Sequence, residues 1–382
     1  MKIAFIGQKG IPTQQGGIEK HVEELSIRLA DLGFDVTVYS RPHYTGDTRK
    51  SYEYKGVKII NLPSIKTKNL DAISHTFIAT IHALFQDYDI IHYHGVGPSL
   101  LSFIPRIFKP KTKVISTFHC IDRQHQKWGL FAKIMLAMGE WAACYFPHET
   151  IAISQILKKY CYYRFDKEVN YIPNGVFVNN TNKNKDAKWL KKNNLKSGNY
   201  IITVSRLIKH KGIHTLIDAY NKLGKINKKL VIVGSGSNTD DYVKQIKNLA
   251  KNNKNIIFTG LKSGEELEAI FRNAELFIQP SETEGLSIAL LEAMAYGVPA
   301  IISNIEENLE PAGGYAIEFI NKDSNDLASK LKYALTHKSE MKQLAIKAKA
   351  RANKDYNWDN IAKNTAKLYC TLAHKVEAFY KI

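Results

Sequence analysis

One stretch, residues 274–302, does most to limit the folds open to this chain. The run from Ala274 to Ile278 is apolar apart from Glu275, which is typical of a buried strand. A polar turn follows, and then Leu286 to Tyr296, rich in helix formers, predicts a helix that Gly297 and Pro299 end. The apolar run from Pro299 to Ile302 predicts the next strand. A strand, a helix and a second strand in so short a stretch favour a parallel sheet covered by helices.

Two glutamates give this stretch a candidate chemistry. Glu284 lies just before the predicted helix, and Glu292 lies inside it among alanine, leucine and methionine. A carboxylate in so apolar a helix is costly unless it faces a polar cavity or a partner. Their separation of eight positions spans roughly 12 Å at helical rise. Because a helix start attracts anions, the pair could hold the two ends of a nucleotide-sugar with its phosphates between them.

The first half of the chain shows the same alternation of strands and helices. Ile3 to Ile6 predicts a buried strand, a glycine-rich loop follows, and Ile18 to Leu32 has helical periodicity. Further strands are expected at 36–39, 57–61, 90–93, 113–118, 150–153 and 169–172, with helices at 70–85, 97–108 and 128–145. The pattern predicts a doubly wound parallel sheet. Gly16 and Gly17 lie either close to a bound phosphate or in an ordinary strand–helix turn, and both interpretations stay open.

The second half begins a new sheet after a polar segment rich in Asn and Lys. Residues 1–178 are expected to form the first domain, 179–199 the linker, 200–356 the second domain, and 357–382 a C-terminal helix that packs back on the first domain. In the second domain, Arg206 and Lys211 flank a loop that leads into a helix, a combination suited to a diphosphate. Without the downstream glutamates, two solvated basic residues would be the better interpretation.

Three histidines follow predicted strands of the first domain, where ligands of parallel sheets bind. His92 and His94 end one strand and His119 ends the next. A histidine there can orient a hydroxyl or move a proton, or it can be a hydrogen-bonded loop residue. We expect function at His119 first. His92 and His94 have no clear third ligand in the sequence, so no metal site is predicted.

Composition excludes several classes of protein. With 44% hydrophobic and 24% charged residues, the chain has the composition of a soluble globular protein. Its 4 cysteines have no Cys-x-x-Cys spacing, which argues against a disulfide scaffold and favours a reducing, cytoplasmic setting. The net charge of +18 suits polyanions, yet no nucleic-acid module is present, so nucleic acid is not an expected partner. The most apolar window, 128–146, contains Lys133 and Glu140 and is not predicted to span a membrane.

These motifs together resemble glycosyltransferase family 4, the retaining group 1 glycosyltransferases of GT-B fold. The resemblance covers nearly the whole chain. It rests on four segments: 16–25 (Gly-Gly-Ile-Glu-Lys-His-Val-Glu-Glu-Leu), 172–176 (Ile-Pro-Asn-Gly-Val), 204–212 (Val-Ser-Arg-Leu-Ile-Lys-His-Lys-Gly), and Glu284 with Glu292 seven intervening residues later. It implies an α/β protein with two Rossmann-like doubly wound domains that face each other across a cleft.

The resemblance also assigns roles to particular residues. Glu284, His119, Arg206 and Lys211 would be catalytic, with the two cations on the donor diphosphate and His119 facing the sugar. Glu292 would hold the ribose hydroxyls. The remaining donor-binding residues would be Gly16, Gly17, Gly234, Gly285, Leu286 and Ser287. The family needs no metal or other cofactor, which agrees with the lack of an Asp-x-Asp motif here, so the cations and the helix start would carry the leaving charge.

One segment departs from the family pattern. Many members have a Gly-Gly-x-x-Glu loop after the strand that follows the paired glutamates. This chain instead has Ser303 to Glu310, Ser-Asn-Ile-Glu-Glu-Asn-Leu-Glu, with Gly313 and Gly314 later. Recognition of the base and of the donor sugar is therefore not carried over from the family.

The predicted function is transfer of a hexose from a nucleotide-diphosphate sugar to a glycan or polyprenyl-linked glycan acceptor. The opening segment is similar to bacterial members that build surface polysaccharides such as O-antigen or capsule, some of them rhamnosyltransferases. A GT-B nucleotide-sugar epimerase and a non-catalytic nucleotide-sugar-binding subunit remain alternatives. The expected location is cytoplasmic. Arg106, Lys109, Lys111 and Lys113 beside apolar 100–107 suggest a peripheral contact with the anionic inner face of the membrane, or only a solvated basic loop.

Overall fold

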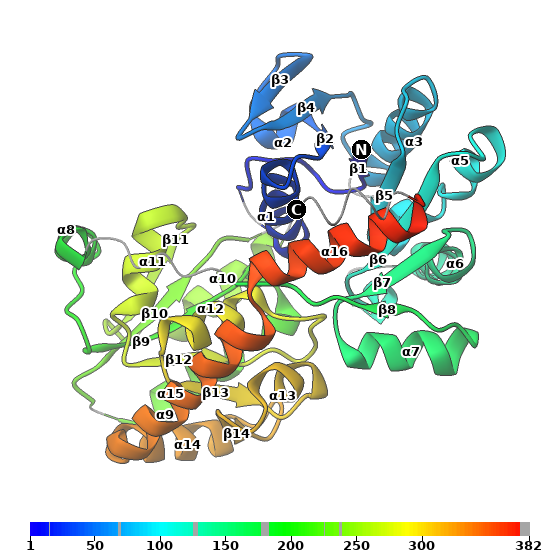
Figure 1. The fold of residues 1–382 in the computed structure, drawn as a ribbon. Helices are drawn as coiled ribbons and strands as arrows, with labels where there is room; N and C mark the ends of the chain where they lie inside the picture. The colour runs from blue at the N-terminus through cyan, green and yellow to red at the C-terminus, as the bar shows by residue number, and fades with distance from the viewer. Residues whose placement is uncertain are drawn as a thin grey trace. The chain divides into compact units, whose positions relative to one another are not determined.

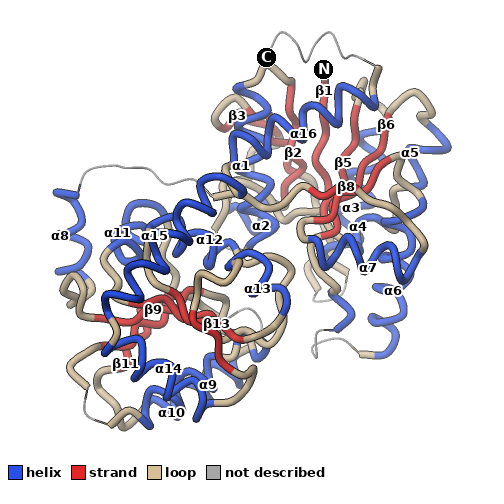
Figure 2. Tube along the Cα trace, turned by 60° about the horizontal axis from the view of Figure 1, so that its bottom comes forward, coloured by secondary structure: helices blue, strands red, loops and turns tan. Residues whose placement is uncertain are grey.

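A computed structural model of the chain describes residues 1–14, 16–67, 70–124, 129–176, 183–224, 226–236 and 239–374. The chain forms two compact units (Figure 1). Unit 1 contains Met1–Gly175 and Trp358–Ile382, and unit 2 contains Val176–Asn357. Each unit is built on its own parallel sheet with helices on both faces, as Figure 2 shows by colour. Each unit is described below by itself.

Unit 1 has an eight-stranded sheet with the order β3-β4-β2-β1-β5-β6-β7-β8. Its strands are β1 (Lys2–Ile6), β2 (Asp35–Ser40), β3 (Ser51–Tyr54), β4 (Val57–Asn61), β5 (Ile90–His94), β6 (Lys113–Phe118), β7 (Glu149–Ala152) and β8 (Asn170–Tyr171). The central strands are buried along almost their whole length, which explains why their apolar runs are visible in the sequence. The edge strand β3 is antiparallel to β4, so the expectation of a purely parallel sheet fails at this edge.

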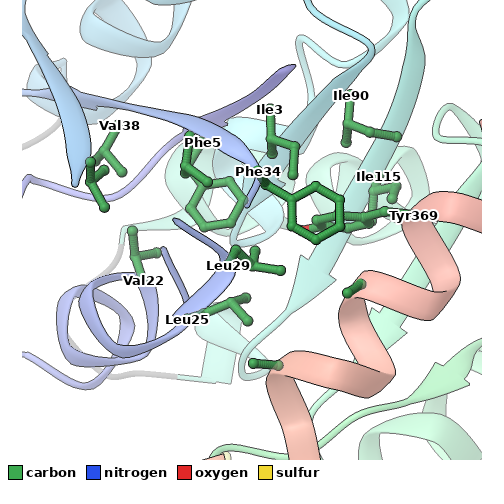
Figure 3. Packing of buried hydrophobic residues seen from close by; sticks show 14 of the residues in the cluster. Ile3, Phe5, Val22, Leu25, Leu29, Phe34, Val38, Ile90, Ile115 and Tyr369 are labelled. Carbon is green, nitrogen blue, oxygen red and sulfur yellow. The ribbon is translucent and has the colours of Figure 1, made fainter. Parts of the chain in front are cut away.

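The helices of unit 1 are α1 (Gly17–Asp31), α2 (Pro42–Thr45), α3 (Asp71–Leu84), α4 (Val96–Ser99), α5 (Phe103–Phe108), α6 (Leu130–Tyr145), α7 (Gln155–Phe165) and α16 (Trp358–Leu372), with a 3₁₀ turn at Asp122–Gln124. The single helix predicted at 97–108 is two short helices, α4 and α5, broken at residues 100–102. Helix α16 packs against α1 in the same core as β1 and β5. Figure 3 shows Tyr369 of α16 beside Ile115 of that core.

Unit 2 has a six-stranded parallel sheet with the order β11-β10-β9-β12-β13-β14. Its strands are β9 (Tyr200–Val204), β10 (Lys229–Val233), β11 (Ile256–Gly260), β12 (Leu276–Gln279), β13 (Ala300–Ser303) and β14 (Ile317–Phe319). Its helices are α8 (Lys183–Lys192), α9 (Ile213–Lys222), α10 (Asp240–Ala250), α11 (Gly264–Arg272), α12 (Ile288–Tyr296), α13 (Glu306–Ala312), α14 (Ser324–Thr336) and α15 (Lys338–Asp355), with a 3₁₀ turn at Lys209–Lys211.

Two boundaries differ from the sequence prediction. The segment expected to be a linker contains helix α8, and Asp186 of that helix forms an ion pair with Arg272 of α11 at 3.1 Å. Most of the segment therefore belongs to unit 2. The C-terminal helix expected at 357–382 is α16 (Trp358–Leu372), and residues 375–382 lie outside the described residues.

Candidate active site

The strand–turn–helix stretch around Glu284 is present in unit 2 as β12, a turn and α12. The helix begins at Ile288, because the Ser287 hydroxyl caps it by accepting a hydrogen bond from the Leu290 amide at 3.3 Å. The sequence prediction started the helix two residues too early, since it counted Leu286 as helical. Gly297 ends the helix in the left-handed conformation with φ 73°. The turn that carries Glu284 is thus fixed at both ends by regular structure.

The carboxylate of Glu284 is held by three donors on one oxygen. Its Oε1 atom accepts from Lys211 Nζ at 2.5 Å, from Gln279 Nε2 at 2.7 Å and from Ser281 Oγ at 2.7 Å. The side chain is 7% exposed. No hydrogen bond from a described residue reaches its other oxygen, Oε2. The arrangement fixes the carboxylate in one orientation and leaves one oxygen for a ligand hydroxyl.

The basic loop predicted to bind phosphate packs directly on the glutamate turn. The Glu282 amide donates to the His210 carbonyl at 2.8 Å. Gly212 has φ 65°, and a Cβ atom there would lie 1.8 Å from the Pro280 carbonyl oxygen, so only glycine fits. The structure therefore brings Lys211 to Glu284, as an ion pair. The side chain of Arg206 is half-buried and forms no hydrogen bond or ion pair with any described residue, which leaves a cation available on the loop that carries Lys211.

The other predicted donor-binding residues of unit 2 lie on the same elements. Gly234 follows β10 with φ 140°, and a Cβ atom there would lie 1.8 Å from the carbonyl oxygen of Ser205, next to Arg206. Leu286 is buried at 6% exposure. Gly285 lies in the turn and Ser287 is the helix cap. Glu292 is half-buried in the middle of α12.

Two further carboxylates near this turn were not singled out from the sequence. Glu282 lies 3.3 Å from Lys322 Nζ and 3.7 Å from His214 Nε2. Glu307 of α13 accepts from the Thr283 hydroxyl at 3.4 Å. Burial raises the pKa of Glu307, and the charge of the nearby Glu284 acts in the same direction. Glu307 belongs to the segment 303–310 that departs from the family pattern, and that departure was the only signal in the sequence.

Unit 1 contains a buried cluster of histidines at the carboxyl ends of β5 and β6. His94 Nδ1 lies 3.2 Å from His119 Nε2. His21 of α1 completes the cluster, with its ring 4.9 Å from that of His119 and its Nδ1 atom 2.9 Å from the Asn174 side-chain oxygen. His92 contacts the hydroxyls of Tyr369 at 2.5 Å and Thr117 at 2.7 Å. His92 is therefore a hydrogen-bonded core residue, whereas His119 has histidine neighbours on two sides.

These histidines are neutral in the folded protein. Burial lowers the pKa of His119, His94 and His92 well below the usual range, and the neighbouring imidazoles act in the same direction. Burial also lowers the pKa of His21 to about 4, although its contact with Asn174 opposes the shift. The Asn174 oxygen can only accept, so Nδ1 of His21 carries the proton and Nε2 presents a lone pair. A neutral imidazole can accept a proton, orient a hydroxyl or bind a metal.

His21 carries no signal in the sequence, and no third ligand beside His92 and His94 was therefore predicted. In the structure, His21, His94 and His119 offer one nitrogen each within 4.8 Å of one another. His21 Nε2 and His94 Nε2 are buried and have no hydrogen-bond partner. The three side chains have the donor type that zinc accepts. As an alternative to metal binding, the rings of His21, His94 and His119 contact one another, and these contacts fix the ring of His119.

The glycine pair at the start of α1 has a neighbour that the sequence did not reveal. Gly16 has φ 113°, and a Cβ atom there would lie 2.0 Å from Glu19 Oε2. Glu19 Oε1 also accepts from the Lys9 amide at 3.2 Å. Glycine at 16 is thus favoured by the backbone conformation. The Glu19 carboxylate therefore lies at this helix start, where the helix dipole favours a negative charge.

Comparison with known proteins supports the motifs. The family described as "Glycosyltransferase Family 4" matches residues 15–180, and the one described as "Glycosyl transferases group 1" matches residues 185–351. An uncharacterized glycosyltransferase of Methanocaldococcus jannaschii is 27% identical over 97% of this chain and 98% of its own length. The O-antigen biosynthesis glycosyltransferase WclY of Escherichia coli is 25% identical over 67% of this chain and 72% of its own.

Solved structures share the fold over the whole chain. Sucrose-phosphate synthase from Thermosynechococcus elongatus superposes with a TM-score of 0.82 at 21% identity, covering 97% of this chain and 98% of that chain. HepE of Anabaena, solved in complex with UDP-glucose, gives a TM-score of 0.80 at 18% identity, covering 97% and 100%. The two family matches together extend over both units, and the fold agrees with them. This chain therefore belongs to the family 4, group 1 glycosyltransferases and is a transferase of GT-B fold.

Proposed function

We propose that the chain is a retaining glycosyltransferase that moves a hexose from a nucleotide-diphosphate sugar to a glycan or polyprenyl-linked glycan acceptor, in the synthesis of a bacterial surface polysaccharide. The observation that carries this proposal is the Glu284 carboxylate, held on one oxygen by Lys211, Gln279 and Ser281 and free on the other. An oriented carboxylate beside a lysine ammonium suits a sugar that is leaving a diphosphate.

Each residue has a specific role in this proposal. Arg206 and Lys211 bind the diphosphate and offset the charge that develops on it as the glycosidic bond breaks. Glu284 Oε2 accepts from a hydroxyl of the transferred sugar, and Glu292 binds the ribose hydroxyls. His119, neutral because it is buried, is the residue of unit 1 that contacts the sugar. Gly16, Gly17, Gly234, Gly285, Leu286 and Ser287 complete the donor-binding set.

The donor class and the biological role rest on relatives. HepE was solved with UDP-glucose, and WclY acts in O-antigen biosynthesis. The alignment covers 72% of WclY, and this coverage supports a related role in surface polysaccharide synthesis. We further propose a cytoplasmic protein with a peripheral membrane contact through Arg106, Lys109, Lys111 and Lys113, since a polyprenyl-linked acceptor is held in a membrane. No helix among the described residues is long and apolar enough to cross a membrane.

The test begins with donor choice. UDP-, GDP-, ADP- and dTDP-sugars are screened for the ligand that raises the melting temperature, since a ligand that binds only the folded state stabilises it. Transfer from that donor to candidate acceptors is then assayed, and the anomeric configuration of the product is read by NMR. Retention of the donor configuration is expected. Inversion would contradict the proposed stereochemistry, and sugar epimerisation without an acceptor would favour the epimerase.

Two variants test the site itself. Glu284→Gln keeps the size of the side chain but removes the charge, and we expect turnover to fall by about 10²-fold or more, in line with losses of single electrostatic groups in other enzymes. Glu318→Gln, on an exposed carboxylate of β14, is the matched control and should leave turnover unchanged. Equal turnover by both variants would exclude Glu284 from the chemistry. A donor that binds without any turnover on any acceptor would favour a non-catalytic binding subunit.

A chelator distinguishes two roles of the histidine cluster, which can either bind a metal or hold the ring of His119 in place. We propose that the reaction needs no metal, because Arg206 and Lys211 supply the positive charge that a metal would otherwise supply. Turnover should therefore be the same after dialysis against EDTA. Loss of turnover, with recovery on adding zinc, would instead assign His21, His94 and His119 to a metal that the reaction uses.

A further inference from the structure

The outer face of α6 carries large apolar side chains that the core of unit 1 does not use. Helix α6 packs against α4 through small residues, and a Cβ atom at Gly139 would lie 2.5 Å from the carbonyl oxygen of Val96. Ala142 and Ala143 are fully buried on the same side. The opposite side has six large side chains that are 46% to 78% exposed: Leu130, Phe131, Ile134, Met138, Trp141 and Tyr145. Burying the small residues and exposing the large ones reverses the usual pattern of a surface helix.

The exposed face continues onto α5. Phe146, which caps α6, lies with its ring 5.1 Å from Trp141 and 5.5 Å from Phe103 of α5. Arg106 donates from Nη1 to the Phe146 carbonyl at 3.1 Å, which ties the two helices together. Helix α5 adds Phe103, Ile107 and Phe108, which are 37% to 69% exposed. We call these nine exposed residues of α5 and α6 the apolar strip; Figure 2 shows α6 at the margin of unit 1.

The surroundings of the strip are basic. Residues 100–146 contain 7 Lys+Arg against 2 Asp+Glu, a net charge of +5. One of the two acids, Glu140, is buried and paired with Arg123 at 2.9 Å, so α5 and α6 present no carboxylate outward. Arg106, Lys111 and Lys133 are exposed. Two copies of so basic a surface would repel each other, which argues against a dimer formed through the strip.

An anionic lipid surface matches both properties. Apolar side chains enter the boundary between headgroups and acyl chains, tryptophan and tyrosine are favoured at that depth, and lysine and arginine contact the anionic headgroups. Helix α6 has 16 residues and a length of about 24 Å, so it can lie in the interface without crossing it. We propose that the apolar strip docks unit 1 on an anionic bilayer, with α6 in the plane of the interface and Arg106, Lys111 and Lys133 on the headgroups.

This surface extends beyond the basic loop expected from the sequence. Three of the four residues named there are partly engaged within unit 1: Arg106 donates to the Phe146 carbonyl, Lys109 donates to the Gln86 carbonyl at 2.8 Å, and Lys113 is half-buried. The main apolar contribution comes from α6. In the sequence this helix lies within the apolar window 128–146, which is not predicted to span a membrane. Docking does not depend on sugar transfer, so the two proposals can fail separately.

Flotation of the full chain with vesicles tests the docking. One set is phosphatidylcholine with one-quarter phosphatidylglycerol, and the other is phosphatidylcholine alone. We expect binding to the anionic set, weakened by added salt, and slower hydrogen exchange in the α6 peptide of the wild-type protein when those vesicles are present. Binding to neither set, or unchanged exchange in α6, would overturn the proposal.

Matched variants locate the contact. Phe131→Ser with Ile134→Ser should abolish binding, whereas Ile346→Ser, on an equally exposed residue of α15, should not change it. Lys111→Gln with Lys133→Gln should lower the partition coefficient about 25-fold, or about fivefold for each charge. Lys342→Gln with Lys347→Gln on α15 is the control for charge.

Two further readouts complete the test. The Phe131→Ser, Ile134→Ser protein should keep its melting temperature and its turnover on a soluble acceptor, because both side chains are exposed. Light scattering should give the same mass for this variant and the wild type. A wild-type dimer that the double substitution separates would make the strip an interface between copies and would overturn membrane docking.

Discussion

Lowering the pH from 7 to 5 should destabilise unit 1 through its buried histidines. His21 is the clearest case, since it is 2% exposed and burial lowers its pKa to about 4. In the unfolded chain a histidine has a pKa of about 6.5. Below that pH the unfolded chain takes up a proton that the folded chain refuses. The stabilising contribution is therefore complete above about pH 7 and is lost as the pH falls toward 4.

The magnitude follows from the two pKa values. For a histidine that stays neutral in the folded state, the free energy of unfolding is about 2 kcal/mol lower at pH 5 than at a pH well above 6.5. Burial lowers the pKa of His92, His94 and His119 well below the usual range as well, so each of these residues adds a loss of the same sign. Typical domains are stable by about 5–15 kcal/mol in total. The loss from His21 alone is therefore a sizeable part of such a total, and unit 1 should be less stable at pH 5 than at pH 7.

The assay is urea unfolding at pH 7, 6 and 5, read by pulsed hydrogen exchange and mass spectrometry of peptides from α1 and β5. The His21→Gln variant should be less stable than the wild type at pH 7, because it loses the Asn174 contact. Its stability should also fall less steeply between pH 6 and 5, by about 1 kcal/mol per pH unit, since one proton fewer is taken up on unfolding.

Substitution of an exposed histidine in unit 2, His337→Gln, is the control and should leave the pH dependence of unit 1 unchanged. Equal unfolding free energies of wild-type unit 1 at pH 7 and pH 5 would refute the reasoning. So would an unchanged slope in His21→Gln, because that result would mean that His21 is already protonated in the folded protein.

Three other substitutions test single contacts. Tyr369→Phe leaves the buried His92 without its 2.5 Å partner and should cost unit 1 about 1–3 kcal/mol in the same urea assay; no change would mean that water replaces the hydroxyl. Gly212→Ala, with φ 65° and a Cβ atom 1.8 Å from the Pro280 carbonyl, should cost unit 2 more than the roughly 1–2 kcal/mol of the left-handed conformation alone and should weaken donor binding in a thermal-shift titration. Glu140→Gln breaks a buried ion pair and should cost unit 1 about 2 kcal/mol, and a neutral result would show that the pair adds nothing over an amide.

The sequence was most informative where one physical signal dominates. Strands β12 and β13 lie where the apolar residues of 274–278 and 299–302 predict them, because central parallel strands are buried on both faces. The start of α12 was predicted two residues early because a serine cap and a helical serine look alike in a sequence. Helix α8 was missed because its polar composition resembles a linker, and only its contact with α11 distinguishes the two.

The candidate site was predictable only in its motif residues. Glu284, Lys211, Arg206 and Gly234 carry recognisable spacing, and the structure places them on one set of loops in unit 2. His21 lies in an amphipathic helix pattern where a histidine draws no attention. Its neighbours His94, His119 and Asn174 lie between 73 and 153 residues further along the chain, a proximity that only the fold creates.

Glu284 has three hydrogen-bond donors, and this number decides how much free energy it costs to move Lys211 from the carboxylate to a bound diphosphate. Lys211 is bonded to the carboxylate, and in the proposed function it also contacts phosphate. If Lys211 were the only partner of Glu284, its transfer to phosphate would leave a nearly buried carboxylate without a donor, at a cost of about 1–3 kcal/mol. Gln279 and Ser281 remove that cost, because both still donate to the same oxygen after the lysine has moved. The two neutral donors therefore let one cation serve two anions in turn while Oε2 keeps its direction.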